Sequence, residues 1–64
     1  MTYHQRELEY RLKFYDFTPE QVIAELDMLH SGEITQCRFA LPLYVWYAAK
    51  EVIWERDGLH QKPQ

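Results

Sequence analysis

The segment from Phe39 to Trp54 constrains this chain more than any other, because it is apolar on almost every side of a helix. It contains two Trp, two Tyr and one Phe among aliphatic residues, and only Lys50 and Glu51 carry charge. A helix that is apolar nearly all round has to be covered on several faces. The whole chain has only 64 residues. The segment therefore predicts a helix with more apolar surface than its own chain can cover.

The length of the chain allows one small domain. A domain of this size buries only about 60% of its unfolded surface and is marginally stable. Cys37 is the one cysteine, so an internal disulfide is excluded. Most of the available apolar area comes from aromatic side chains, namely two Trp, five Tyr and three Phe. We expect a single helical domain over residues 1–59 and a disordered tail over residues 60–64.

The clearest helix start in the sequence is at residues 18–21. Thr18 precedes Pro19, and Gln21 follows Thr18 by three positions, which is the pattern of a capping box with proline at the first helical position. Ser31 and Gly32 are typical of the end of a helix, with the glycine in a left-handed conformation. The pattern predicts a helix over residues 19–30.

Proline and glycine also delimit the apolar segment. Pro42 lacks an amide hydrogen and disfavours helical conformation in the residue before it, so the main helix is expected to begin near Pro42. Gly58 is a natural stop, which gives a helix over about residues 42–57. Residues 33–41 fit a connector, a short helical turn or an irregular first turn of the next element. A helix from about Gln36 with a kink at Pro42 is the alternative.

The first segment has two interpretations. Residues 5–13, QRELEYRLK, are rich in helix formers, and Glu7 and Arg11 stand four positions apart in the favourable order. Residues 7–14 also alternate between apolar and charged side chains, which is typical of a strand. We favour a helix over about residues 3–15, because a strand needs a partner and no other segment alternates well. A strand over residues 7–14, paired across a dimer axis, is the alternative.

The predicted fold class is all-α, with three short helices in a homodimeric helical bundle; α+β is the alternative. We expect the second and third helices to pack as a pair, with the first helix across them. The small side chains of the third helix suit packing inside the protomer: Val45, Ala48, Ala49 and Val52. Trp and Tyr are enriched at interface hot spots. The predicted protein interface therefore consists of the large residues that remain: Tyr44, Trp46, Tyr47, Ile53 and Trp54. The competing interpretation is that the other two helices cover these side chains in a monomer.

Candidates for catalysis or metal binding are weak. The spacing of His4, His30, Cys37 and His60 does not match the paired ligands of zinc modules, so we interpret them as surface histidines and a buried thiol. Glu51 is the carboxylate most closely surrounded by apolar residues, but no nucleophile–base pair or phosphate-binding loop accompanies it. We expect no enzymatic activity, no cofactor and no metal.

The charge distribution disfavours direct nucleic-acid binding. The net charge is −3, and residues 18–33 carry four acidic side chains and neither Lys nor Arg. A helix-turn-helix would have to read bases with aromatic side chains, whereas base edges favour Arg, Lys, Asn and Gln. Arg6, Arg11 and Lys13 leave one alternative, a nucleic-acid-associated transcriptional regulator whose dimer assembles a basic surface.

Neither a signal peptide nor a membrane span is indicated. The longest uncharged apolar run, residues 39–49, is well under the ~20 residues that span a bilayer. Residues 1–20 are mixed and charged, without an apolar core segment. We expect a cytoplasmic protein with no membrane partner.

Two stretches, MTYHQRELEYRLKFYDFTPEQVIAELDMLHSGEITQ and LYVWYAAKEVIW, resemble a group of small accessory proteins of lambdoid bacteriophages. These proteins are encoded in the early leftward exo–xis region. The resemblance covers most of the chain but contains no diagnostic motif and supplies no functional residues. It implies an early phage protein in the host cytoplasm, which binds a host or phage protein and modulates host functions or phage development.

Overall fold

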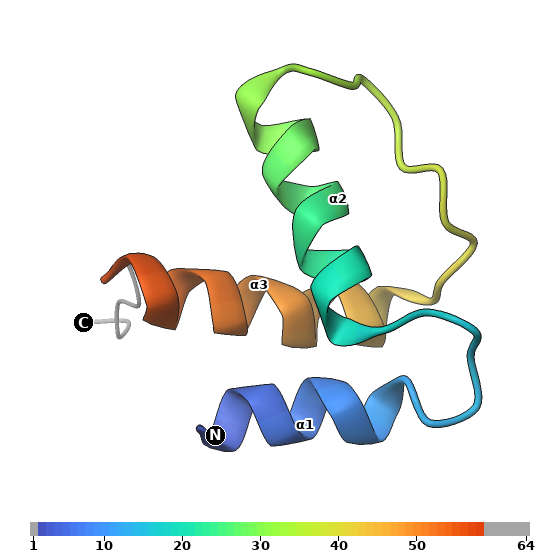
Figure 1. The fold of residues 1–64 in the computed structure, drawn as a ribbon, viewed down its shortest axis with the longest axis vertical. Helices are drawn as coiled ribbons and strands as arrows, with labels where there is room; N and C mark the ends of the chain where they lie inside the picture. Colours follow the sequence, from blue (N-terminus) through green and yellow to red (C-terminus); the bar gives the residue numbers. More distant parts are fainter. Residues whose placement is uncertain (1, 59–64) are drawn as a thin grey trace.

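A computed structural model of the protein describes residues 2–58 and contains three helices (Figure 1). They are α1 (Tyr3–Arg11), α2 (Pro19–Ser31) and α3 (Leu43–Asp57). No strand occurs among residues 2–58, so the all-α prediction is confirmed and the strand alternative for residues 7–14 is wrong. The tail predicted over residues 60–64 lies outside the described residues.

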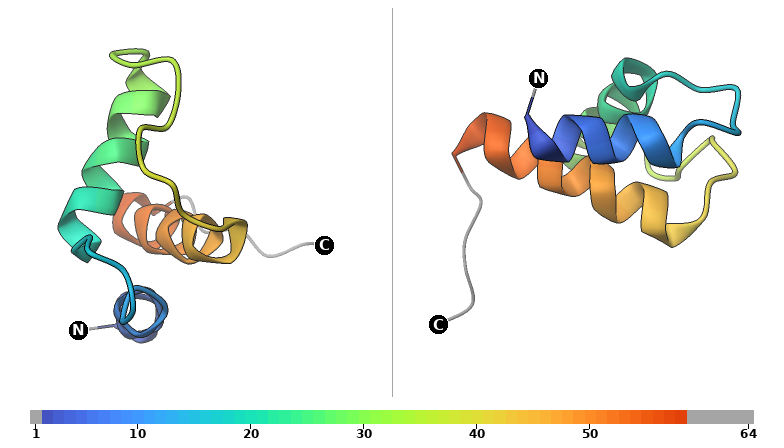
Figure 2. Two further views of the ribbon diagram at one scale, coloured as in Figure 1. Left: turned by 90° about the vertical axis from the view of Figure 1, so that its right-hand side faces the viewer. Right: turned by 90° about the horizontal axis from the view of Figure 1, so that it is seen from below.

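Helices α1 and α3 lie side by side and run in opposite directions, and α2 lies across α3 and extends away from α1 (Figures 1 and 2). Both α1 and α2 pack mainly against α3 and touch each other little. Helix α2 does pack on α3 as expected, but α1 is the helix that lies alongside α3 (Figure 1), so the expectation that the first helix lies across the other two is wrong. Ala48 and Ala49 are buried on α3, and their small side chains let another helix approach closely. The buried apolar core contains Leu8, Leu12, Val22, Val45, Trp46, Ala48, Ala49 and Val52.

Helix α1 begins with a capping box that the sequence interpretation did not use. The amide of Gln5 donates to Oγ1 of Thr2 at 3.2 Å, and the amide of Thr2 donates to Oε1 of Gln5 at 2.9 Å. These two bonds satisfy backbone donors that the first turn of a helix leaves free. The capping box favours a helix in this segment over the strand that the alternation suggested.

Helix α1 is shorter than predicted, because it ends at Arg11 rather than near residue 15. The amides of Lys13 and Tyr15 donate to carbonyls only three residues back, at 3.1 and 2.9 Å, so the chain tightens into turns. Leu12 is 4% exposed at the point where the helix ends. The chain thus leaves the helix as soon as its last core residue is placed, and residues 13–18 lead to α2.

Helix α2 has the predicted start and stop. Thr18 and Gln21 form the capping box, with bonds of 3.2 and 2.9 Å. The helix extends one residue further than predicted, to Ser31, and Gly32 follows with φ of +84°. A residue with a side chain is strained at this backbone angle, which explains the glycine.

Replacing Thr18 with alanine is expected to lower the free energy of unfolding by about 1 kcal/mol, because the first turn of α2 loses its cap. Urea denaturation followed by circular dichroism measures this change. Thr35→Ala is the matched control, since Thr35 is exposed in the loop after α2. Equal stability of the two variants would contradict the role of the cap.

Helix α3 begins one residue later than predicted, and Pro42 is its N-cap rather than its first residue. The carbonyl of Pro42 accepts hydrogen bonds from the amides of Val45 and Trp46. The segment between Gly32 and Pro42 contains no helix, so it is a connector. Phe39 in this connector stacks on Phe17 and Trp46, with ring centroids 4.3 and 6.5 Å apart. The stack joins both connecting segments to α3.

Candidate protein-binding surface

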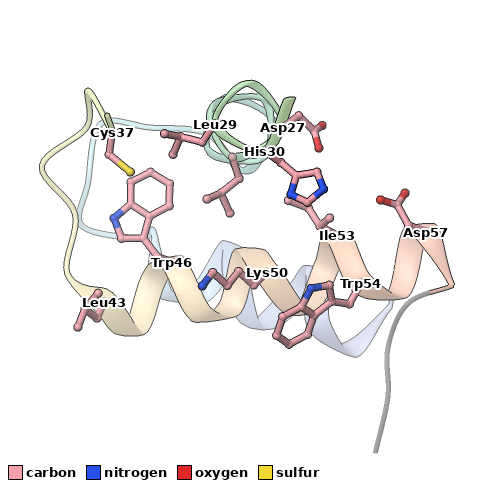
Figure 3. A pocket seen from close by; sticks show the side chains of 11 residues that line it. Asp27, Leu29, His30, Cys37, Leu43, Trp46, Lys50, Ile53, Trp54 and Asp57 are labelled. Atoms are coloured by element: carbon pink, nitrogen blue, oxygen red, sulfur yellow. The ribbon is translucent and has the colours of Figure 1, made fainter. Parts of the chain in front are cut away.

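A groove of about 570 Å³ lies between α2 and α3 (Figure 3). We call it the α2–α3 groove. Its apolar lining comes from Leu26 and Leu29 on α2 and from Trp46 and Ile53 on α3. The connector contributes Cys37, whose thiol lies close to the Trp46 ring in Figure 3. The remaining lining residues are Asp27, His30, Leu43, Lys50, Trp54 and Asp57.

Two residues that line the α2–α3 groove, Asp27 and Asp57, form ion pairs with Arg56. Its Nη1 and Nη2 donate to the two carboxylate oxygens of Asp27 at 3.0 Å each, and its Nε donates to Asp57 at 2.7 Å. The guanidinium lowers the pKa of Asp57, and the two carboxylates raise the pKa of Arg56 above its usual value. All three side chains are partly exposed, so these pairs fix the geometry more than they stabilise the fold.

The structure brings together three of the five residues predicted for a protein interface. Trp46, Ile53 and Trp54 all line the α2–α3 groove. Trp46 is only 8% exposed, and its Nε1 donates to the carbonyl of Leu41 at 3.1 Å, so the protomer itself covers most of this ring. Trp54 is 40% exposed at the edge of the groove. The role of these residues in an interface stays a prediction.

The other two predicted residues lie on the side of α3 that adjoins α1. Tyr47 is 56% exposed and Tyr44 is 49% exposed. The carbonyl of Tyr44 accepts a bond of 2.7 Å from Nη1 of Arg11, whose guanidinium carbon lies 5.7 Å from the Tyr44 ring centroid. The neighbouring side chain of Tyr44 raises the pKa of the Tyr15 phenol. Tyr44 is thus held within the protomer, and Tyr47 is the more available of the two.

The sequence interpretation missed an ion pair beside the groove, between the buried carboxylate of Glu25 and the exposed side chain of Arg38. Glu25 is 0% exposed, and its carboxylate accepts bonds from the Arg38 amide at 2.7 Å, from Nη2 at 2.8 Å and from Nε at 3.2 Å. The side-chain bond from Arg38 lowers the pKa of Glu25, although burial opposes this shift. Because Arg38 follows Cys37, this pair fixes the connector wall of the groove. The sequence feature that could have indicated this ion pair is the position of Glu25 on the apolar stripe of α2.

The described residues that were considered for metal binding, His4, His30 and Cys37, do not form a metal site, although His30 and Cys37 both line the groove. Among residues 2–58, no three His, Cys, Asp or Glu side chains are placed to hold a metal ion. Cys37 is exposed, so the expectation of a buried thiol is wrong; Arg38, the next residue in the connector, is the one held against α2. His60 lies outside the described residues. Oε1 of Glu51 on α3 lies 3.8 Å from Nε2 of His4 on α1.

None of the helices in the described part of the chain is long and apolar enough to cross a membrane. The chain matches no protein-family model, no curated protein and no solved structure.

Proposed function

We propose that this protein is a small non-enzymatic regulator that binds another protein through the α2–α3 groove. The observation that supports this proposal is the apolar lining of the groove together with its open edge, where Leu43 is 68% exposed and Trp54 is 40% exposed. An amphipathic helix commonly binds by placing its apolar face in such a groove. Buried aromatic side chains commonly supply most of the binding free energy.

The proposal includes a cellular setting and an oligomeric state. The resemblance to lambdoid accessory proteins supports an early bacteriophage protein in the host cytoplasm, where it binds a host or phage protein and modulates host functions or phage development. The exposed apolar surface of α3 supports a homodimer. The proposed dimer surface shares Leu43, Lys50 and Trp54 with the open edge of the groove, and the two proposals are tested with different variants below.

A nucleic-acid-associated dimer is the second candidate, and one feature at the end of α1 and in the turn that follows it favours this candidate. Tyr10 is 70% exposed and Phe14 is 87% exposed, and Nζ of Lys13 lies 6.0 and 5.7 Å from their ring centroids. Exposed rings beside a cation can stack with the bases of a single strand. A gel-shift titration with single-stranded DNA tests this function, since phosphate binding weakens steeply as salt increases. Binding that is absent even at low salt would remove this candidate.

The groove is tested with Leu29→Lys. Leu29 lines the groove and is half-buried, and the lysine places a charge there while its aliphatic stem can still pack. We expect the variant to fold and to lose the partner that the wild-type protein captures from a bacterial lysate. Ala24→Lys is the matched control, because Ala24 is exposed on the same helix and the change in charge is identical.

The result is decided by comparing the captured proteins by mass spectrometry. A protein retained by the wild type and by Ala24→Lys, but lost with Leu29→Lys, supports the groove as the binding site. Capture of the same proteins by both lysine variants, with both variants folded by circular dichroism, would contradict it.

A further inference from the structure

One face of α3 points away from the core and carries a stripe with the spacing of a coiled coil. Leu43, Tyr47, Lys50 and Trp54 follow each other at intervals of four, three and four residues, and we call them the α3 stripe. All four are exposed; the exposed fractions of Leu43, Tyr47 and Trp54 are 68%, 56% and 40%. Helices with apolar residues at this spacing commonly pack against a second helix.

We propose that a second copy of this chain covers the α3 stripe, with the two α3 helices antiparallel about a two-fold axis between residues 48 and 49. This inference specifies the homodimer of the proposed function, and three residues of the stripe, Leu43, Lys50 and Trp54, also line the open edge of the α2–α3 groove. In this register, Leu43 lies opposite Trp54 of the second copy, and Tyr47 lies opposite Lys50 of the second copy. The two-fold axis repeats each contact, so one stripe satisfies both copies.

Charge complementarity selects the antiparallel arrangement. Lys50 is the one charged residue of the stripe, and antiparallel pairing places its ammonium against the aromatic ring of Tyr47 from the other copy, which is a favourable cation–π contact. The same two groups already lie near each other within the protomer, with Nζ of Lys50 5.7 Å from the Tyr47 ring centroid. A parallel pair would instead place Lys50 against Lys50, and like charges at an interface are unfavourable.

Shape complementarity favours the same register. The bulky indole of Trp54 meets the smaller Leu43 at both ends of the antiparallel pair, whereas a parallel pair stacks Trp on Trp at one end and Leu on Leu at the other. The opposite face of α3 is occupied by its own protomer, because Val45, Ala48, Ala49 and Val52 are buried there. The stripe is therefore the face of α3 that a second α3 can contact.

The experiment combines sedimentation equilibrium with two charge variants at the stripe. The wild type is expected to be a dimer. Tyr47→Lys places a lysine opposite Lys50, and Lys50→Glu removes the cation that faces Tyr47, so we expect each variant to dimerise at least roughly tenfold more weakly. Tyr10→Lys, at an exposed tyrosine of α1, is the matched control and should dimerise like the wild type.

Mixing the two variants tests the register directly. In an antiparallel heterodimer, the lysine introduced by Tyr47→Lys in one copy faces the glutamate introduced by Lys50→Glu in the other. At the symmetry-related contact, Lys50 of the first copy faces Tyr47 of the second, as in the wild type. The mixture should therefore dimerise more tightly than either variant alone. A parallel pair would not bring residues 47 and 50 together. Circular dichroism checks that both variants are folded.

Three outcomes would overturn the inference: a monomeric wild type at high concentration, single variants that dimerise like the wild type, or a mixture that stays monomeric. Leu29→Lys is expected to remain dimeric, because Leu29 is not part of the stripe. A wild-type protein that is monomeric but still captures a partner through the groove would refute this inference and leave the proposed binding function standing.

Discussion

Replacing Leu8 with alanine is expected to lower the free energy of unfolding by about 2–5 kcal/mol. Leu8 is 0% exposed in the core that α1 and α3 share, so truncation removes apolar contacts and leaves a cavity. A domain of 64 residues is stable by roughly 3–10 kcal/mol in total. The variant is therefore expected to be substantially unfolded at moderate temperature.

Urea denaturation at a fixed protein concentration measures this loss, since dimerisation would otherwise change the apparent stability. Tyr10→Ala is the matched control on the same helix, because Tyr10 is 70% exposed and its removal leaves no cavity. A Leu8→Ala variant that unfolds at the same urea concentration as Tyr10→Ala would mean that α1 contributes little to the core.

The second large effect is expected for Arg38→Met. The substitution removes the guanidinium but keeps the backbone amide, which is left as a single donor to the buried carboxylate of Glu25. A buried charge without its partner is strongly destabilising. We expect a larger loss of stability than for Arg56→Met, because the carboxylates that bind Arg56 are partly exposed and can be solvated.

The wild type and Arg38→Met should also differ in how their stability depends on pH. In the wild type the pKa of Glu25 is lowered, so the stabilisation is present above the pKa of the unfolded carboxyl and is lost as pH falls through the folded pKa. In Arg38→Met, burial becomes the dominant influence and raises the pKa of Glu25. The charged carboxylate then destabilises the folded state above that pKa, and the penalty disappears as pH falls.

The difference in unfolding free energy between wild type and Arg38→Met should therefore be largest near neutral pH and should shrink from about pH 7 to about pH 4. Thermal or urea unfolding at several pH values measures it, with Arg56→Met as the control. A difference that stays constant across this range would show that the loss does not come from the charge of Glu25.

The helices could be predicted because their ends are encoded by short local signals. Thr18 with Gln21 and the left-handed Gly32 are properties of a few neighbouring residues, and the structure has both. The capping box of Thr2 and Gln5 is equally local and would have removed the strand alternative. The stop at Arg11 was missed because it depends on where Leu12 meets the core.

The packing of the helices and the contents of the groove could not be predicted in the same way. Periodicity identifies the apolar face of a helix but does not say which helix will cover it, so the α1–α3 pair was not expected. The bond between Glu25 and Arg38 joins residues 13 positions apart through a connector without periodicity. The burial of Trp46 depends on that connector, whose carbonyl at Leu41 accepts the indole hydrogen. The sequence nevertheless indicated Ile53 and Trp54, which do line the groove.

The central position of α3 has a consequence for how the protein is made. Both other helices pack on it, although it is the last of the three to leave the ribosome. The bond between Arg11 and Tyr44 joins residues 33 positions apart. Helix α1 has nine residues, which is too short to persist in water alone. A nascent chain that ends before residue 43 therefore has two apolar faces and no surface to cover them, and folding waits for the final helix.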